Sequence, residues 1–118
     1  MTNRFPSALY RRGSEPDPRF SLANERTFLA WVRTSLALLA AGVALEALVV
    51  PISPGFRLAA AIVFVLLGVT AAVQAWVGWM RTEQALRESE PLRGPSVGLV
   101  IVVGVVLAVV LMTLGFIW

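Results

Sequence analysis

The chain has 118 residues, of which 58% are hydrophobic and only 14% are charged, and its mean hydropathy is +0.78. Soluble domains carry about 25% charged residues, so this composition indicates an integral membrane protein. The chain contains no cysteine and no histidine, which excludes disulfides, thiol or imidazole catalysis and the usual zinc ligands. All ten basic residues are arginine, and the net charge is +3.

Three long apolar runs are separated by segments rich in proline, glycine and charge. Each run exceeds the ~20 residues that a helix needs to cross hydrocarbon, and none shows the alternation of barrel strands. We therefore predict an all-α membrane protein, a bundle of three transmembrane helices at about residues 18–50, 58–90 and 96–118 within a domain spanning 17–118. Residues 1–16, with two prolines and a glycine, are expected to form a flexible cytoplasmic tail.

The first helix is expected to begin with Asp17 as its N-cap and Pro18 as its first residue. From there, arginine and alanine recur at alternating spacings of four and three, which places them on one face of the helix. This stripe consists of Arg19, Ala23, Arg26, Ala30, Arg33, Ala37, Ala40 and Ala44.

Two interpretations of the stripe stay open at this point. A face of small residues lets another helix approach closely, with each arginine extending to the cytoplasmic headgroups. This works less well for Arg33, which lies about 9 Å deeper than Thr27 at 1.5 Å per residue. Alternatively, the stripe lines an aqueous funnel or pore at the axis of a symmetric oligomer, where rings of arginine attract anions.

A polar cluster of Asn24, Glu25, Arg26 and Arg81 is expected at the cytoplasmic surface. Glu25 would pair with Arg81 at the same depth on the second helix, and Asn24 would bond to loop backbone or to headgroup phosphate. The cluster would either lock the first helix to the second or bind phosphate.

Charged residues further along the chain are fewer. Glu46, the only acid within an apolar run, is expected to be solvated or paired with Arg57, the alternative being a group that senses protons or cations. The second helix is expected to extend into water, because Glu83 and Arg87 have the i,i+4 spacing of a helical ion pair. Pro91 should then stop it.

The arginines also predict the orientation of the chain. Six of them precede or open the first helix and three lie between the second and third, whereas only Arg57 lies between the first and second. The positive-inside rule then places the N-terminus and the second loop in the cytoplasm, and the first loop and the C-terminus outside.

Residues 16–45, with the core Ala-Asn-Glu-Arg-Thr-Phe-Leu at 23–29, closely resemble the YidH family of small bacterial inner-membrane proteins. Members of that family belong to a domain-of-unknown-function group. The resemblance covers most of the chain and implies a multi-pass protein of the bacterial inner (plasma) membrane, with three spans and a basic loop before the third.

The same core is similar, more distantly, to the transmembrane domain of the eukaryotic vacuolar transporter chaperone complex, which makes polyphosphate and moves it across a membrane. There, five three-helix units surround a conduit with basic residues at its cytoplasmic mouth. The resemblance implies anion-handling roles for the positions that match its motifs, Arg19, Arg26 with its neighbour Glu25, Arg81 and Arg93. Arg33 has an uncharged counterpart in the eukaryotic relatives. The polymerase and sensor domains are not in this sequence, so synthesis of polyphosphate is not expected.

The sequence therefore predicts a homo-oligomer, ring-like and with five copies if it follows the distant relative, whose basic cytoplasmic vestibule binds or conducts phosphate-rich anions such as phosphate or polyphosphate. The alternative is a non-catalytic accessory or scaffold subunit of a larger membrane complex. Beyond the lipid bilayer, no nucleic-acid partner, cofactor, metal or enzymatic activity is expected, because no acid–base or nucleophile constellation is present. The anion-binding or pore-lining candidates are Arg19, Arg26, Arg33, Arg81 and Arg93, with Asn24 and Glu25 as a structural polar cluster.

Overall fold

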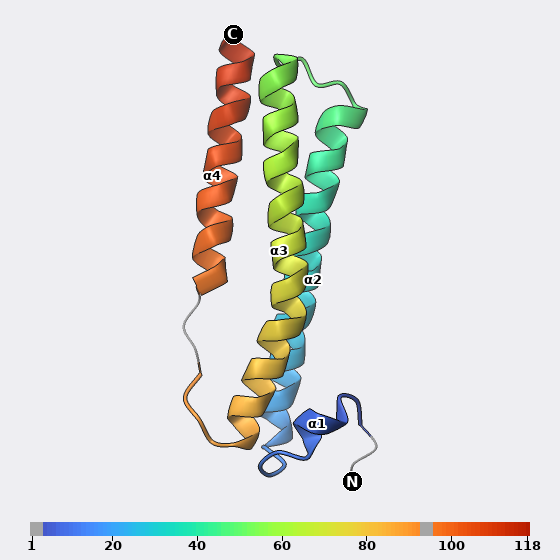
Figure 1. Cartoon of the computed structure of the whole chain (residues 1–118), viewed down its shortest axis with the longest axis vertical. Coiled ribbons are helices and arrows are strands. Elements are labelled where there is room, and N and C mark those ends of the chain that lie inside the picture. Colours follow the sequence, from blue (N-terminus) through green and yellow to red (C-terminus); the bar gives the residue numbers. More distant parts are fainter. Residues whose placement is uncertain (1–3, 93–95) are drawn as a thin grey trace.

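The computed structural model describes residues 4–92 and 96–118 and forms a helical rod with extents of 59 × 25 × 20 Å (Figure 1). α2, α3 and α4 are long and apolar enough to cross a membrane, which confirms the predicted bundle of three membrane-length helices. No strand occurs in the part of the chain that the structure describes. The helices are α1 (Ser7–Tyr10), α2 (Pro18–Ala47), α3 (Pro54–Arg87) and α4 (Ser96–Ile117).

α2 begins as the sequence predicts. The side chain of Asp17 accepts a hydrogen bond of 2.9 Å from the backbone N–H of Arg19, and Pro18 takes the first helical position. The helix ends at Ala47, earlier than predicted. The cause is local, because Val49 adopts a left-handed conformation with a φ of 49°, which cannot continue the helix.

α3 lies closer to the N-terminus than its predicted range. It starts at Pro54 and not at residue 58, because Ser53 takes the N-cap position and proline suits the first helical position. It ends at Arg87 and not near residue 90, because Ser89 has a left-handed φ of 55°. The helix therefore stops before it reaches Pro91.

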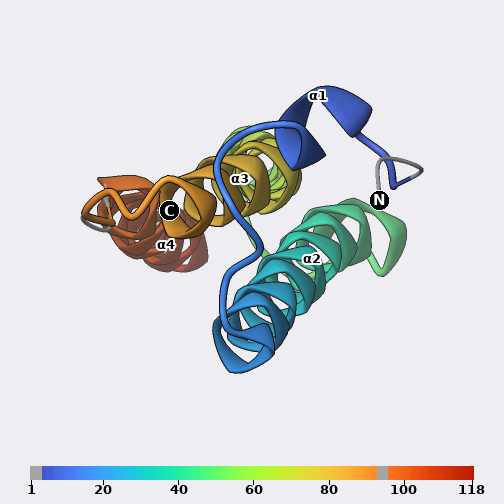
Figure 2. The same ribbon diagram turned by 90° about the horizontal axis from the view of Figure 1, so that it is seen from below.

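α3 is the central helix of the bundle. It packs against α2 on one side and α4 on another, whereas the described residues of α2 and α4 do not pack against each other (Figure 2). Glycine allows close approach within this interface, since a Cβ on Gly42 would lie only 2.9 Å from the carbonyl oxygen of Ala61. The core consists of two small clusters, one of Leu38, Leu67 and Ala71 and one of Leu45, Ala60 and Ala61.

Most apolar side chains point outward from the bundle. In the most apolar stretch of α4 only 6% of the residues are buried inside the protein, and the corresponding shares are 22% for α2 and 28% for α3. A continuous apolar exterior of this size would be costly in water and is suited to hydrocarbon. The bilayer, and not an internal core, therefore covers most of the apolar surface.

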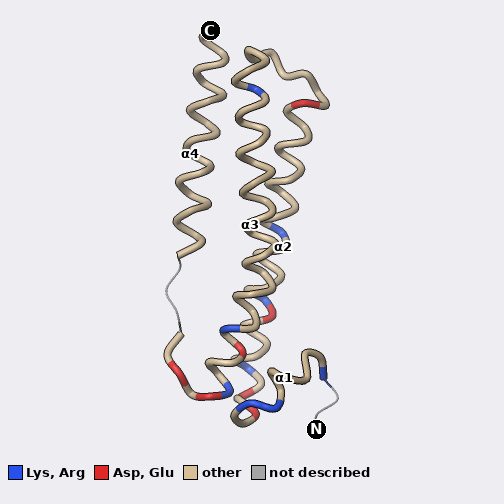
Figure 3. The backbone as a smooth tube through the Cα atoms, viewed as in Figure 1, with Lys and Arg blue, Asp and Glu red and all other residues tan. Residues whose placement is uncertain are grey.

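Most of the charged residues lie toward one end of the rod (Figure 3). We call this the charged end; it holds α1, the start of α2 and the end of α3. Toward the opposite end, the Nε atom of Arg57 lies 3.3 Å from Oε1 of Glu46. Glu46 is thus paired with Arg57, the simpler of the two expectations for this residue.

Residues 4–16 differ from the flexible tail that the sequence predicts. They form the short helix α1 and then cross the end of α3 toward the start of α2 (Figure 2). Leu9 is buried, with only 4% of its surface exposed, and α1 contacts α3. Contacts with Arg87, described below, hold this segment in place. We call residues 4–16 the N-terminal strap.

Candidate functional site

The arginine–alanine stripe lies on the side of α2 that faces away from α3. Each of its residues from Arg19 to Ala40 is exposed, and Ala44 is half-buried. The buried residues of α2 occupy the other side of the helix; they are Asn24, Ser35, Leu38, Gly42 and Leu45. No helix that the structure describes packs on the stripe, although Ala30 borders an open groove toward α4.

The three arginines of the stripe differ in their partners. Nη2 of Arg19 lies 2.8 Å from Oδ2 of Asp17, and the side-chain and backbone hydrogen bonds from Arg19 lower the pKa of Asp17. Arg26 and Arg33 take part in none of the ion pairs among the described residues. Arg19 is therefore largely neutralised within the chain, whereas the charges of Arg26 and Arg33 are uncompensated.

Arg81 lies apart from the stripe. It is exposed and lines an open pocket of about 320 Å³ between the end of α3 and the residues that follow, together with Gln74, Glu90 and Ser96. No residue of α2 lines this pocket. Within one chain, the structure therefore does not bring Arg81 and the stripe together. Arg93 lies outside the described residues.

Asn24 joins α2 to α3. Its side chain is buried, and Nδ2 donates hydrogen bonds to the carbonyl oxygen of Trp79 at 3.0 Å and to Oε1 of Glu83 at 3.4 Å. The hydroxyl of Ser21 donates to Oε2 of Glu83 at 2.8 Å. Both oxygens of the buried Glu83 carboxylate are thus hydrogen-bonded by α2, as burial of a charged group requires.

Glu25, the expected partner of Arg81, is exposed and forms no ion pair among the described residues. Adjacent helical residues lie about 100° apart, so Glu25 lies beside the contact that Asn24 makes with α3 and not within it. The expected Glu25–Arg81 pair is therefore absent, and Glu83 is the acidic residue of the α2–α3 interface. Sequence reasoning had assigned Glu83 only to a pair with Arg87 on the same helix.

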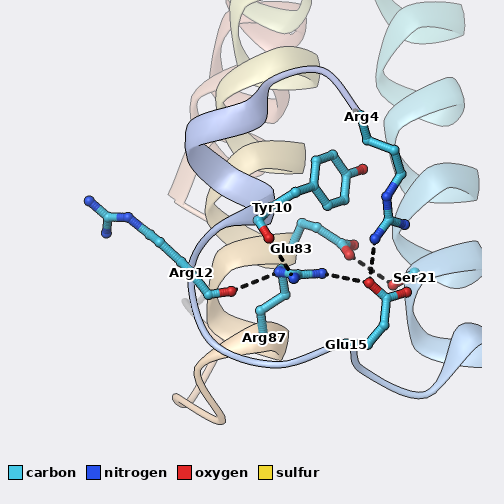
Figure 4. A network of polar contacts seen from close by, with 7 residues as sticks. All are labelled: Arg4, Tyr10, Arg12, Glu15, Ser21, Glu83 and Arg87. Atoms are coloured by element: carbon cyan, nitrogen blue, oxygen red, sulfur yellow. Dashed lines mark hydrogen bonds and ion pairs between the residues drawn. The ribbon is translucent and has the colours of Figure 1, made fainter. Parts of the chain in front are cut away.

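Arg87, which sequence reasoning placed only in an ion pair with Glu83, forms a second polar centre (Figure 4). Its side chain is only 6% exposed. Nε donates to the carbonyl oxygen of Arg12 at 2.9 Å, and Nη2 donates to that of Tyr10 at 2.9 Å. Nη1 donates to Oε1 of Glu15 at 3.0 Å. The guanidinium is therefore enclosed by the N-terminal strap and does not pair with Glu83.

The strap also fits closely against the backbone of Arg87. The N–H of Ser14 donates to the carbonyl oxygen of Arg87 at 3.0 Å, which satisfies one of the free carbonyls at the end of α3. A Cβ on Gly13 would lie 2.1 Å from the same oxygen, and Gly13 has a φ of +58°. Only glycine suits both the conformation and the contact, so Gly13 was the sequence signal for this approach.

The carboxylate of Glu15 bridges two arginines. Its Oε1 accepts hydrogen bonds from Arg4 and from Arg87. Both bonds lower the pKa of Glu15, and the bond from Arg4 has the larger effect. The guanidinium groups of Arg4 and Arg87 also lie 4.2 and 5.2 Å from the ring centre of Tyr10. The strap is thus held by charge-assisted contacts.

A pocket of about 430 Å³ lies between the strap, α2 and α3. No group of three or more acidic, histidine or cysteine side chains within residues 4–92 and 96–118 could hold a metal ion. The strap contributes Arg4, Tyr10 and Glu15 to the pocket, α2 contributes Pro18, Ser21, Leu22, Glu25 and Phe28, and α3 contributes Trp76, Trp79 and Glu83.

Three membrane-length apolar helices with charge gathered at one end define a small multi-pass membrane protein. Residues 19–85 match the family model described as Domain of unknown function (DUF202). The chain is 43% identical over 101 residues to the inner membrane protein YidH of Escherichia coli (strain K12), covering 85% of this chain and 86% of that protein. It is 46% identical over 103 residues to the uncharacterized protein Rv2272 of Mycobacterium tuberculosis, covering 81% of this chain and 84% of that protein.

The chain belongs to this YidH-like DUF202 family, as the sequence resemblance indicates, and is a multi-pass inner membrane protein. The residues matched by the family model include the stripe arginines, Asn24 and Glu83, but neither the N-terminal strap nor Arg87. No solved structure matches the chain.

Proposed function

We propose that this protein forms a ring-like homo-oligomer in which the stripe on α2 faces a shared axis, and that the resulting basic vestibule binds phosphate-rich anions and conducts them. Its charged end would face the cytoplasm, in keeping with the positive-inside rule. The observation that carries the proposal is the position of Arg26 and Arg33, which lie without ion-pair partners among the described residues on a face that no described helix covers.

Arg33 supports this proposal most directly. It lies seven residues beyond Arg26 in α2 and therefore about 10 Å further along the helix. An arginine facing lipid near the middle of a membrane helix costs about 2.5–3.5 kcal/mol on insertion scales. A second copy of α2 packed along the alanines, or a water-filled axis between copies, would remove that cost, because small residues allow helices to approach closely.

Guanidinium groups also suit the proposed ligand. They present several donors in a rigid plane that matches phosphate oxygens and stay charged at any physiological pH. In the proposed ring, Arg26 and Arg33 from each copy contribute two successive layers of positive charge. Arg19 contributes less, because Asp17 already neutralises it. Arg81 and Arg93 would extend the basic surface outside the axis.

The test uses purified protein in detergent and in reconstituted bilayers. Subunits are counted by native mass spectrometry, and binding of inorganic polyphosphate is measured with Arg26→Glu, Arg33→Gln and Arg11→Gln. Arg11 is a matched control, because it is exposed at the charged end and forms no ion pair among the described residues. We expect three or more subunits and binding weakened by at least about tenfold in both stripe variants, equivalent to about 1.4 kcal/mol.

Current measurements separate binding from conduction. If polyphosphate-dependent current falls with binding in Arg26→Glu, the vestibule is also a pathway. A monomer, or equal binding by all four proteins, would remove the basis for the proposal.

The second candidate is an accessory or scaffold subunit of a larger membrane complex. The observation that favours it is an open groove of about 300 Å³ between α2 and α4, which a helix of another protein could fill. Purification in mild detergent separates the candidates, because a stoichiometric foreign partner supports the scaffold and a ring of identical subunits supports the vestibule. The groove is lined by Thr27, Ala30, Trp31, Thr34, Gly98 and Ile101.

A further inference from the structure

The N-terminal strap is joined to α3 mainly through one residue. Three donors of the Arg87 guanidinium bind the strap, and the Arg87 carbonyl oxygen accepts the N–H of Ser14. A buried arginine is tolerated only while its donors are satisfied, and here the strap satisfies them. The strap can therefore close only with Arg87 buried beneath it, and Arg87 is buried only while the strap is closed.

Beyond Arg87, the strap makes few contacts, one of which is an ion pair of 3.8 Å between Nη1 of Arg12 and Oε1 of Glu88. Leu9 is its only buried apolar residue within the described chain, and Phe5 makes a single stacked contact with Trp76 while remaining 81% exposed. Segments with few buried apolar contacts and exposed polar bonds open locally, at a smaller free-energy cost than global unfolding. The strap meets that description.

The bundle beneath the strap is held by separate contacts. Asn24 bonds to the carbonyl oxygen of Trp79, and the hydroxyl of Ser35 donates to the carbonyl oxygen of Gly68 at 2.7 Å. Neither bond involves a residue of the strap. α2 and α3 can therefore stay together when the strap leaves, which makes opening a local event.

Opening would also have a defined effect on the surface. The strap supplies Arg4, Tyr10 and Glu15 to the pocket whose α3 wall consists of Trp76, Trp79 and Glu83. With the strap closed, Glu83 is 4% exposed. Removal of the strap would increase the exposure of these three α3 side chains, of which Trp76 is already 42% exposed, and would leave the Arg87 guanidinium accessible to solvent.

We propose that the N-terminal strap is a lid with Arg87 as its latch: closed, it covers the pocket between α2 and α3, and it opens by releasing Arg87 while the bundle stays folded. The lid requires neither an oligomer nor an anion, so it stands apart from the proposed function.

The absence of cysteine from the sequence makes the test direct. Spin labels are attached to Ala8→Cys on α1 and Ala23→Cys on α2, both exposed positions, and the distance between them is measured by pulsed electron paramagnetic resonance. The full-length chain is used in bilayers and diluted with unlabelled copies, so that only distances within one chain are read. We expect one narrow distribution at neutral pH, and a broad distribution shifted to longer distances in Arg87→Gln.

Arg81→Gln is the matched control. Arg81 lies on the same helix at the same end, is exposed and forms no ion pair among the described residues, so its distribution should equal that of the parent. Circular dichroism should show unchanged helix content in both variants. If Arg87→Gln loses helix content, the distance measurement is repeated in Gly13→Ala. There the new Cβ would clash with the carbonyl oxygen of Arg87 and displace the strap, while the Arg87 side chain remains.

Three results would overturn the lid proposal. The first is a broad distribution in the parent protein, which would mean that the strap is not latched. The second is a narrow, unshifted distribution in the folded Arg87→Gln variant, or in Gly13→Ala where Arg87→Gln does not fold, which would mean that the contacts at Arg87 do not hold the strap. The third is loss of helix content in Gly13→Ala as well, because closure would then be inseparable from the fold.

Discussion

The side-chain amide of Asn24 donates a hydrogen bond of 3.0 Å to the backbone carbonyl oxygen of Trp79, in the neighbouring helix. This bond places a buried amide where the two longest helices of the protein meet at the charged end. The same amide reaches Glu83, so one side chain of α2 fixes both the backbone and a carboxylate of α3. Removing the Asn24 side chain should therefore destabilise the whole hairpin of α2 and α3.

Asn24→Ala should lower the free energy of unfolding by about 1–3 kcal/mol, because it leaves a buried carboxylate with one fewer donor. Denaturant-induced unfolding in detergent micelles measures this. Glu25→Ala is the matched control; the neighbouring side chain is exposed, and its removal should change stability by less than about 0.5 kcal/mol. Equal losses in the two variants would contradict the role assigned to Asn24.

Adding one methyl group should have opposite effects at two glycines. In Gly42→Ala the new Cβ would meet the carbonyl oxygen of Ala61 at 2.9 Å, so α2 and α3 must move apart, at a cost of about 1–3 kcal/mol. In Gly55→Ala nothing lies within 4 Å of the new atom, and alanine favours a helix by about 0.5–1 kcal/mol over glycine. Thermal unfolding of both variants checks the contrast, which fails if Gly42→Ala is as stable as the parent.

Acid should open the N-terminal strap. Hydrogen bonds from Arg4 and Arg87 lower the pKa of Glu15 in the folded protein. A depressed pKa means that ionised Glu15 favours the closed strap above the ordinary carboxyl pKa of about 4.3, and that this contribution is lost as pH falls through the lower folded value. The other charged or titratable groups around the pocket are Arg4, Tyr10, Glu25 and Glu83, and Arg87, Arg12 and Glu88 lie at its strap side.

The distance between labels at Ala8→Cys and Ala23→Cys should therefore broaden as pH is lowered. Glu15→Gln removes the titrating group, so its distribution should not change over the same acidic range. A parent protein whose distance distribution stays narrow in acid would contradict the predicted opening. A Glu15→Gln variant that broadens like the parent would show that groups other than Glu15 cause the opening.

Single cysteines at the two ends of the bundle should react from opposite sides of the membrane. We expect a membrane-impermeant maleimide to label Gly55→Cys in intact spheroplasts, and to label Glu90→Cys only after the membrane is permeabilised. The reason is the excess of arginine at the charged end, which the positive-inside rule retains in the cytoplasm. The reverse labelling pattern would invert the orientation and place the proposed vestibule outside.

Much of the fold follows from the sequence because long apolar runs leave few alternatives in a membrane. The cap at Asp17 and Pro18 was predictable for a different reason, because both residues act on their immediate neighbours in the sequence. The ends of α2 and α3 were missed, because Val49 and Ser89 take left-handed conformations that neither residue type favours.

The polar sites were harder to predict. The hydrogen bond from Arg87 to the carbonyl oxygen of Arg12 joins residues 75 positions apart, and no local pattern specifies such a pair. The i,i+4 spacing of Glu83 and Arg87 indicated a local ion pair, whereas each side chain bonds to a different distant segment. Periodicity identified the stripe on α2, but it left open whether another helix of the chain packs on it, and it could not show that Arg81 lies beside a different pocket.

The weak attachment of α4 has a consequence for biogenesis. In the described chain, every side-chain hydrogen bond between two membrane-length helices joins α2 to α3. α4 packs on α3, and it meets the turn between α2 and α3 through a backbone hydrogen bond of 3.0 Å from the N–H of Ser53 to the carbonyl oxygen of Gly115. During synthesis, the first two spans can therefore leave the translocon as a finished hairpin before the last span is translated. The last span then needs only to dock laterally from lipid, so its truncation should leave an inserted, paired hairpin behind.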